Sequence, residues 1–276
     1  MAKIVTITNP LTGQPAQVDQ LDHTAQQIDD GLNIARGVSN PNLLDNWYFG
    51  NPVNQRNVSG VIDAVGYFLD RWKLVSGSVT IGSNGITLNG TIVQILETAV
   101  GTDVTASALT AEGVVVASYD NNSKTISLTG TGQTFVAAKL ELGSQQTLAH
   151  QDENGNWQLN EIPDYGEQLR RCQRYFWRSW TGERHNQNSI LGRVFGASTN
   201  RITGFSYPVE MRSKPTITIY GITGRDKITD YDSDVDYGDV APIYWDTQRC
   251  IALSITGGGL SMGTYVYYFV EANAEL

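Results

Sequence analysis

The sequence predicts a mainly β protein, in which a short N-terminal coiled-coil helix is followed by two β-sandwich or jelly-roll domains. Short runs of alternating Thr, Val, Ile and Ser dominate after residue 40, and such runs favour strands. Glycine is abundant at 28 residues, which suits tight turns between strands. A chain of 276 residues has room for a helical segment and two domains of about 100 to 150 residues each.

Residues 18–35 have the spacing of a short coiled coil. Their apolar residues recur at alternating steps of three and four, at Val18, Leu21, Ala25, Ile28, Leu32 and Ala35. This narrow seam requires partner helices, and branched residues at both seam positions favour three or more strands over a dimer. We therefore expect a homotrimer, although a single amphipathic helix packed on its own domain also fits the pattern. A helix this short is marginal alone in water, so later domains must help to hold the chains together.

Residues 1–41 form the first predicted unit, a docking arm and the coiled-coil helix. Residues 1–17 hold one short alternating run and then several Asn, Pro and Gly turn formers. Such an arm suits docking into another protein or a neighbouring subunit, and a frayed terminus is the alternative. Gly37, followed by Asn40 and Pro41, marks the end of the helix.

Residues 42–147 are predicted to form a jelly roll. Turn signals at Gly77, Gly82, Asn84-Gly85, Asn89-Gly90, Asn121-Asn122 and Gly130 separate strands at residues 47–49, 67–74, 78–81, 86–88, 92–97, 104–108, 114–119, 125–128 and 134–142. This density of short strands is typical of a sandwich or jelly roll.

Residues 148–163 are polar and predict a linker or an exposed hairpin. Residues 164–276 are predicted to be a second β-sandwich, which begins with a helix over residues 165–174. Asp164 precedes Glu167 by three residues, the spacing of a capping box, and Leu169 and Cys172 follow at helical intervals.

The charge and composition exclude several classes of partner. A formal net charge of -9 argues against binding nucleic acid or an anionic lipid surface. No apolar run approaches the roughly 18 residues of a membrane span, and the N-terminal residues lack the pattern of a secretory signal. We therefore expect that the chain folds in a cytoplasm and does not insert into a membrane. Cys172 and Cys250 match no paired metal spacing and are expected to be reduced thiols, with a disulfide less favoured.

An acidic run at residues 230–239 is the sharpest candidate for a metal site. Carboxylates at every second position fit a calcium loop, but a helix-loop-helix site also needs Gly at position 6 and Glu at position 12. If the loop begins at Asp230, these positions hold Val235 and Ala241. If it begins at Asp232, they hold Tyr237 and Ile243. That class of site is excluded. An irregular calcium site and a solvated acidic loop both stay open, and we assign no metal ligand and no cofactor.

The sequence offers no catalytic arrangement. Histidine occurs only as His23, His150 and His185, and no Ser lies in a Gly-x-Ser-x-Gly setting. We expect no enzyme activity. For ligand binding we select Trp180, Arg184 and His185, which we expect to be exposed in a polar, loop-like stretch, with a polar loop and a half-buried Trp as the alternative. We add Tyr231 and Tyr237, because aromatic faces stack on pyranose rings while the neighbouring carboxylates accept sugar hydroxyl protons.

Several stretches resemble tail fibre and other virion appendage proteins of tailed phages and prophages. They are NLLDNWYFGNPVNQR (residues 42–56), GYFLDRW (66–72), FVAAKLELGSQQT (135–147), EQLRRCQRYFWRSW (167–180), YPVEMRSKPTIT (207–218) and VEANAEL (270–276). The first three resemble a jelly-roll domain that is itself similar to carbohydrate-binding modules, and Trp72 matches a Trp of those modules. Residues 181–202 and 222–250 match nothing in this family.

The resemblance implies a tail fibre subunit of the virion, assembled in the bacterial host cytoplasm. Its arm would dock on other virion tail proteins. A homotrimer would attach to bacterial surface polysaccharide through the C-terminal β-sandwich, residues 164–276, as the receptor-binding domain, with avidity compensating for weak single sites. A purely structural virion protein of the baseplate, neck or head fibre is the main alternative, and a glycan-degrading enzyme is a minor one.

Overall fold

The structure, a computed structural model, describes residues 39–152, 154–185, 188–195, 200–237, 245–255 and 260–276. The chain is mainly β, as predicted, and its strands form antiparallel sheets. The docking arm and the predicted coiled-coil residues Val18, Leu21, Ala25, Ile28 and Leu32 lie outside the described residues. No helix in the described ranges has the length and apolar character needed to cross a membrane.

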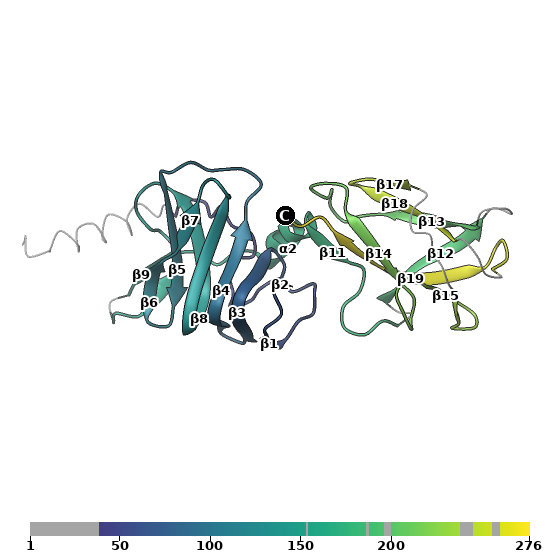
Figure 1. Cartoon of the computed structure of the whole chain (residues 1–276), viewed down its shortest axis with the longest axis horizontal. Coiled ribbons are helices and arrows are strands. Elements are labelled where there is room, and N and C mark those ends of the chain that lie inside the picture. The colour runs from purple at the N-terminus through teal and green to yellow at the C-terminus, as the bar shows by residue number, and fades with distance from the viewer. Residues whose placement is uncertain (1–38, 153, 186–187, 196–199, 238–244, 256–259) are drawn as a thin grey trace, which may run out of the picture.

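The described chain forms two β lobes arranged in line, with helix α2 and the last residues of the sequence between them (Figure 1). The N-terminal lobe contains β1 (Gly60–Ile62), β2 (Gly66–Leu69), β3 (Trp72–Gly82), β4 (Gly85–Ile95), β5 (Val104–Thr110), β6 (Gly113–Val116), β7 (Ser118–Asp120) and β8 (Thr125–Leu142). A hairpin of β9 (Ala149–Gln151) and β10 (Trp157–Leu159) follows. The sequence predicted a linker or an exposed hairpin over residues 148–163, and the structure shows a hairpin there.

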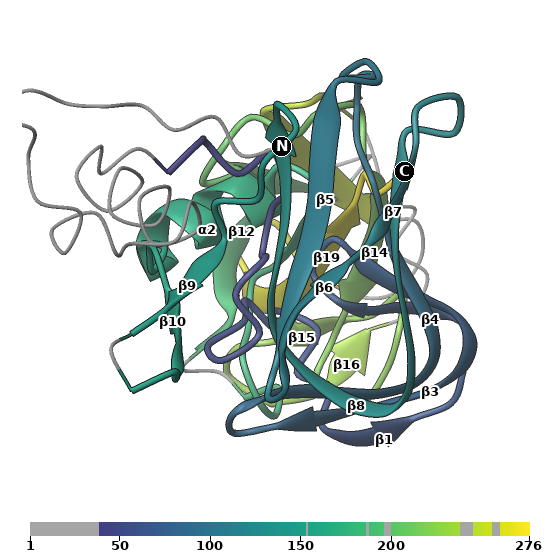
Figure 2. The ribbon, with the colours of Figure 1, turned by 90° about the vertical axis from the view of Figure 1, so that its left-hand side faces the viewer.

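Strand β8 joins the two parts of the N-terminal sheet. Its first half pairs with β4 and its second half with β5, and the change of partner occurs at Phe135. Residues 43–49 run along the second half of β8, where the Leu43 amide donates to the Leu140 carbonyl at 2.9 Å. The sheet curls as a result (Figure 2), and its apolar faces enclose a core.

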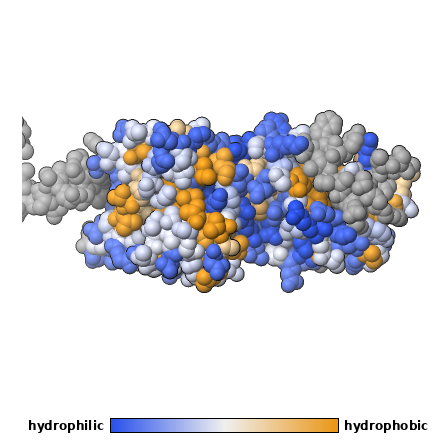
Figure 3. All heavy atoms as spheres, viewed as in Figure 1, coloured by the Kyte–Doolittle hydropathy of each residue, from blue (hydrophilic) through white to orange (hydrophobic). Residues whose placement is uncertain are grey.

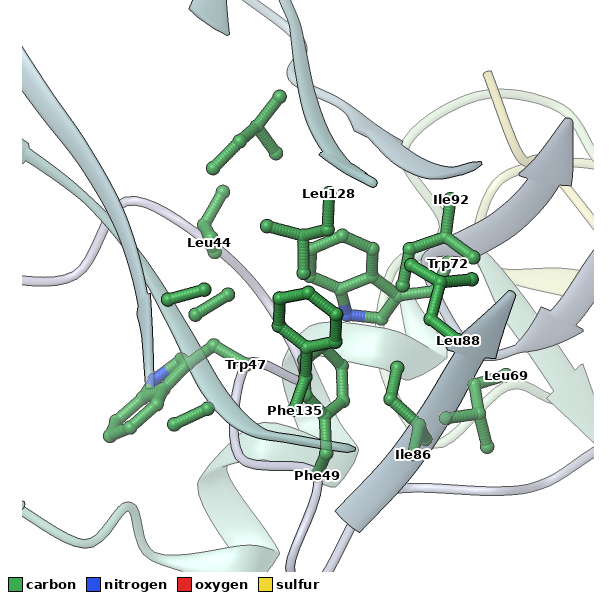
Figure 4. Packing of buried hydrophobic residues seen from close by; sticks show 14 of the residues in the cluster. Leu44, Trp47, Phe49, Leu69, Trp72, Ile86, Leu88, Ile92, Leu128 and Phe135 are labelled. Carbon is green, nitrogen blue, oxygen red and sulfur yellow. The ribbon is translucent and has the colours of Figure 1, made fainter. Parts of the chain in front are cut away.

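Aromatic side chains fill the centre of this core (Figure 4). Trp72 and Phe49 are fully buried and meet edge to face, with ring centroids 5.2 Å apart. The Trp72 indole donates to the Asn46 carbonyl at 2.9 Å, so its one polar atom is satisfied. Ile86, Leu88 and Ile92 of β4 are buried on the same side of the sheet, because every second side chain of a strand points to the same face.

A row of glycines lies within strands at three of the predicted turns. Gly77 of β3, Gly90 of β4 and Gly130 of β8 are paired in register across three strands. The sequence predicted turns at Gly77, at Asn89-Gly90 and at Gly130, and these predictions are wrong because β3, β4 and β8 continue through these positions. A Cβ at Gly90 would lie 2.1 Å from the Ser76 carbonyl oxygen, so only glycine lets the strands approach this closely.

A turn that the sequence did not predict divides residues 67–74. Strand β2 ends at Leu69 and β3 begins at Trp72, so Asp70 and Arg71 form the connection. Arg71 has φ +70°, a left-handed conformation that costs energy for a non-glycine residue. Contacts to the second lobe hold it there.

The C-terminal lobe is built around one long strand. It contains α2 (Tyr165–Gln173), β11 (Phe176–Arg178), β12 (Ile190–Phe195), β13 (Asn200–Ser206), β14 (Thr216–Tyr220), β15 (Ile228–Asp230), β16 (Asp236–Tyr237), β17 (Trp245–Asp246), β18 (Cys250–Ile255) and β19 (Tyr265–Asn273). Strand β19 pairs with β12 and β15 along its first half and with β11 and β14 along its second half. The predicted helix start is confirmed, because the Asp164 carboxylate accepts the Glu167 amide at 2.8 Å. Cys172 and Cys250 are free thiols.

Arg71 is the centre of the junction between the lobes. Its side chain is 1% exposed and pairs with Glu275 at 3.0 Å and with Asp45 at 3.1 Å. Its remaining terminal nitrogen donates to the Ile95 carbonyl at 2.6 Å. The guanidinium carbon lies 3.5 Å from the centroid of the Tyr175 ring. The residues that follow the last strand of the C-terminal lobe are therefore bound to the N-terminal lobe through a buried ion pair.

Further contacts cross the junction beside Arg71. Arg56 pairs with Glu275 at 3.2 Å. The Gln55 side-chain amide donates both to Asp70, at 3.2 Å, and to the Phe176 carbonyl, at 2.7 Å. Burial raises the pKa of Asp70 to about 7, against hydrogen bonds from Gln55 and the positive charge of Arg56, which lower it.

Four of the six motifs that resemble virion appendage proteins meet at this junction. Gln168 of the EQLRRCQRYFWRSW stretch accepts the backbone amide of Asn46 of the NLLDNW stretch at 2.7 Å. Arg71 belongs to the GYFLDRW stretch and Glu275 to the final VEANAEL stretch. These motifs therefore build the core and the joint between the lobes, which explains why they contain no catalytic pattern.

The first described residues are tied directly to the N-terminal lobe. The Lys139 ammonium, which is fully buried, donates to the Ser39 hydroxyl at 2.6 Å and to the Thr147 hydroxyl at 2.9 Å. It also lies 3.7 Å from the buried Glu141 carboxylate. The Asn40 amide donates to the same Thr147 hydroxyl at 3.1 Å. The chain is thus fixed to the lobe from residue 39 onward.

Candidate functional site

A groove of about 960 Å³ runs along β5, β6 and β7 of the N-terminal lobe. This volume lies at the upper end of the range typical of ligand sites, about 300 to 1,000 Å³. Its walls come from these strands, from the turns beside them and from the β9–β10 hairpin. The floor is backed by the hydrophobic core, because Val104, Ala106 and Val114 both line the groove and pack on that core.

Two half-buried aromatic residues mark the ends of β6 in the groove. Trp157 of β10 lies over Gly113, where a Cβ would come within 2.6 Å of the indole nitrogen. Gly113 has φ +133°, so glycine serves both the backbone conformation and the close approach of the ring. Tyr119 follows β6, and its hydroxyl accepts the Val100 amide at 3.2 Å. Both rings pack on the core, which fixes their orientation.

Four amide side chains line the groove, and two of them are held by the protein. Asn121 accepts the Gly101 amide at 2.9 Å. Gln146 donates to the Ala149 carbonyl at 2.9 Å and accepts a backbone amide at 3.0 Å. Asn122 and Gln145 are exposed, and within the described ranges their side chains make no hydrogen bond. These two amides are free to bond a ligand.

Ser107 adds a buried hydroxyl to the groove. It is 2% exposed, it lies on β5 beside Val116 of β6, and it is one of the lining residues. Its hydroxyl has no hydrogen-bond partner in the described part of the chain. Buried polar groups are nearly always paired in native proteins, and the oxygen atom itself is buried, so we assign this hydroxyl no ligand contact.

The predicted ligand residue Trp180 is buried instead of exposed. It is 5% exposed, and its ring packs edge to face on Tyr220 at 5.3 Å and on Phe269 at 5.8 Å. The Arg178 guanidinium covers it, 4.0 Å from the ring centroid. The expectation of an exposed Trp180 is wrong because this ring closes a small aromatic cluster over β19.

Arg184 lies beside Trp180, as expected from their proximity in sequence. Its guanidinium is 4.8 Å from the centroid of Tyr220 and 6.0 Å from that of Trp180, distances at which cations are attracted to ring faces. His185 is exposed, and its backbone amide donates to Asn188 at 3.2 Å. The structure therefore places Arg184 on the aromatic cluster and leaves His185 at its edge.

Tyr231 joins the same face of the C-terminal lobe, and Tyr237 does not. Tyr231 is 52% exposed, and its ring meets that of Tyr267 edge to face at 6.4 Å. Tyr267 contacts Phe269, which contacts Trp180, so an aromatic row links Tyr231 to Trp180. Tyr237 packs on the separate core cluster that contains Val194 and Val266.

The sequence did not single out the exposed residues that extend this aromatic row. Tyr265 is 49% exposed, and the Arg193 guanidinium lies 5.5 Å from its ring centroid. Phe195 and Leu191 of β12 are also exposed. Burial alternates along β12, but its six residues ILGRVF do not alternate between apolar and polar types, so the sequence carries no clear signal of which side chains are exposed.

The acidic run is occupied by internal hydrogen bonds. Asp230 accepts from the amide and the hydroxyl of Ser233 at 2.9 and 2.8 Å, and Asp234 accepts the Tyr267 hydroxyl at 2.7 Å. Burial alone raises the pKa of Asp236, but hydrogen bonds from Thr223 and Thr229 outweigh it and lower the pKa. Within the described ranges, no three His, Cys, Asp or Glu side chains gather as a metal site.

Comparison of the chain with family models, with curated proteins and with solved structures finds no match. The resemblance to virion appendage proteins therefore rests on the quoted motifs, and the functional argument rests on the groove and on the aromatic face of the C-terminal lobe.

Proposed function

We propose that this chain is a virion tail fibre subunit that attaches to polysaccharide on a bacterial surface as a homotrimer. The observation that carries the binding function is the groove of the N-terminal lobe. It combines two oriented aromatic rings with free amide groups, Asn122 and Gln145. Aromatic rings stack on the apolar faces of pyranoses, while amides both donate to and accept from sugar hydroxyls.

Trimerisation through residues 18–35 and a jelly-roll assignment for the N-terminal lobe complete the proposal. A single open sugar site is weak, in the millimolar to micromolar range by general expectation. Three linked copies raise the effective affinity without new contacts. The aromatic face around Tyr231, Arg184 and Tyr265 supplies a second surface, on the C-terminal lobe.

Surface composition supports a structural virion protein as the second candidate. Val116 is 93% exposed and Val115 is 40% exposed on β6, which is the last strand of its sheet. Figure 3 shows apolar residues gathered on the visible face of the N-terminal lobe, while that of the C-terminal lobe is hydrophilic. An exposed apolar edge strand suits packing against another subunit.

A glycan-degrading enzyme has less support. Glycoside hydrolysis ordinarily uses two carboxyl groups on either side of the scissile bond. In the part of the chain that the structure describes, Asp120 is the one carboxylate that lines the groove. The groove thus offers no carboxylate pair.

Binding of the full chain to bacterial envelope polysaccharides tests the proposal. Light scattering is expected to give three times the chain mass of 30.2 kDa. Trp157→Ala is expected to weaken glycan binding about tenfold, the equivalent of one stacked ring. Tyr165→Ala is the matched control, since Tyr165 is 45% exposed on α2 and lies outside the groove.

The outcomes separate the candidates. Binding that Trp157→Ala weakens and Tyr165→Ala spares supports the groove, and Asn122→Ala repeats the test without touching a packed ring. A trimer that binds neither isolated glycans nor envelopes supports the structural candidate. Release of shortened products from a bound glycan supports the enzyme. Monomeric chains in solution contradict the avidity argument.

A further inference from the structure

The groove of the N-terminal lobe is poor in charge. Asp120 is the one formally charged residue among those that line it, and none of its lining residues in the described ranges is Lys, Arg or His. The Asp120 carboxylate accepts hydrogen bonds from the Ser123 hydroxyl at 2.7 Å and from the backbone amide of Asn122 at 2.9 Å. These hydrogen bonds lower the pKa of Asp120, so it keeps its negative charge at neutral pH.

Lys124 and Lys139, which are close in sequence to Asp120, bond other parts of the protein. The Lys124 ammonium donates to the Glu97 carbonyl at 3.1 Å. Lys139 is buried against Glu141 and bonds Ser39. The groove therefore presents an acidic group at one end and no cation to balance an anionic ligand, in a chain whose net charge is already -9.

The groups left for a ligand are neutral. Asn122 and Gln145 are exposed, and within the described ranges their side-chain amides make no hydrogen bond. Such groups match the hydroxyls of a sugar, which donate and accept in turn. A carboxylate or phosphate group would lose its hydration here without gaining an opposite charge, which is unfavourable.

We infer that the groove selects an uncharged stretch of polysaccharide and rejects acidic ones, with Asn122 and Gln145 as the residues that bond its hydroxyls. Asn121 and Gln146 hold the walls in place. This inference rests on the proposed function, because it names the class of glycan that the same groove takes.

Paired polysaccharides test the selectivity. The full chain is titrated with an acidic, uronate-containing bacterial polysaccharide and with the same polymer after reduction of its carboxyl groups. We expect the reduced polymer to bind at least about tenfold more tightly. We also expect its affinity to change little between low and high salt, because no ion pair forms.

Charge-changing variants sharpen the test. Asn122→Lys places a cation in the groove and is expected to strengthen binding of the acidic polymer about fivefold at low salt, with the gain lost at high salt. Asn89→Lys is the matched control. Asn89 is exposed on β4 of the same lobe and is not a lining residue, so the same charge there should leave both affinities unchanged.

Each outcome has one meaning. Preference for the reduced polymer, together with a gain confined to Asn122→Lys, supports the inference. Equal or tighter binding of the acidic polymer by the unmodified chain overturns it and leaves the proposed function intact. Equal gains from Asn122→Lys and Asn89→Lys overturn the role of the groove. Failure to bind any glycan overturns the proposed function and this inference together.

Discussion

Replacement of Arg71 by Met is expected to destabilise both lobes together. Arg71 and Glu275 are 1% and 3% exposed, and Asp45 is 12% exposed. Met keeps most of the apolar volume of the side chain but removes its charge. Two carboxylates then lose their shared partner in a site that water scarcely reaches, and the Ile95 carbonyl loses a charged donor.

The size of the loss in unfolding free energy depends on which cations remain beside the two carboxylates. Removing one partner of a buried ion pair typically costs about 3 to 5 kcal/mol. Asp45 keeps Arg171 at 2.7 Å and Glu275 keeps Arg56 at 3.2 Å, so neither carboxylate is left without a cation. We therefore expect a loss near the lower limit, about 3 kcal/mol in the free energy of unfolding.

Urea denaturation followed by tryptophan fluorescence measures the loss, and hydrogen exchange locates it in each lobe. Arg249→Met is the matched control. Arg249 pairs with Glu210 at 2.8 Å, but the two side chains are 76% and 48% exposed, so at most about 1 kcal/mol is expected. A loss for Arg71→Met no larger than the control, or exchange that rises in only one lobe, would refute the reasoning.

Two further predictions concern the glycine row and the buried carboxyl group at the junction. Gly90→Ala is expected to cost more than about 1 kcal/mol in urea denaturation, because its Cβ would lie 2.1 Å from the Ser76 carbonyl oxygen at φ +148°, whereas Gly82→Ala should cost less because its nearest contact is 3.4 Å. A smaller loss at Gly90 than at Gly82 would contradict the steric account. Burial raises the pKa of Asp70 from 3.8 to about 7, so its contribution favours the folded state at low pH and is lost as pH rises through about 7. Unfolding free energy should then fall by roughly 2 to 3 kcal/mol between pH 5 and pH 8, and Asp70→Asn should remove most of that slope. An equal slope in the variant would assign the pH dependence to other groups.

Local chemistry made some elements predictable from the sequence. The Asp164 cap and the start of α2 follow from side-chain hydrogen bonding within four residues. The turn at Asn84-Gly85 follows from glycine backbone preferences, and β3 and β4 do meet there. The mainly β character follows from composition alone. In each case the cause lies within a few residues of the effect.

Other elements depend on partners distant in sequence. Asn89-Gly90 has the composition of a turn, yet it continues a strand because Gly77 and Gly130 face it from adjacent strands. Arg71 has a left-handed conformation in the tight turn between β2 and β3, and its ion-pair partner Glu275 is 204 residues away in the sequence. Strand register and ion pairs of this kind are not encoded locally.

The candidate site was harder to predict than the fold. Trp157 lies in a polar stretch, and only the packing of β10 on Gly113 brings its ring to the groove. Trp180 stands in a polar context as well, yet Arg178 and Arg184 cover it. In both cases the neighbouring sequence gives no indication of whether the ring is accessible.

The anchoring of Ser39 by Lys139 has a geometric consequence for assembly. Since the chain is held to the lobe from its first described residue, any contact made by the preceding residues sets both the distance and the relative rotation of neighbouring lobes. Grooves on joined copies would then recur at a spacing dictated by the protein. In the proposed trimer, a polymer whose own repeat matches that spacing would gain affinity, and the length of the repeat would become a second criterion of recognition beside its chemistry.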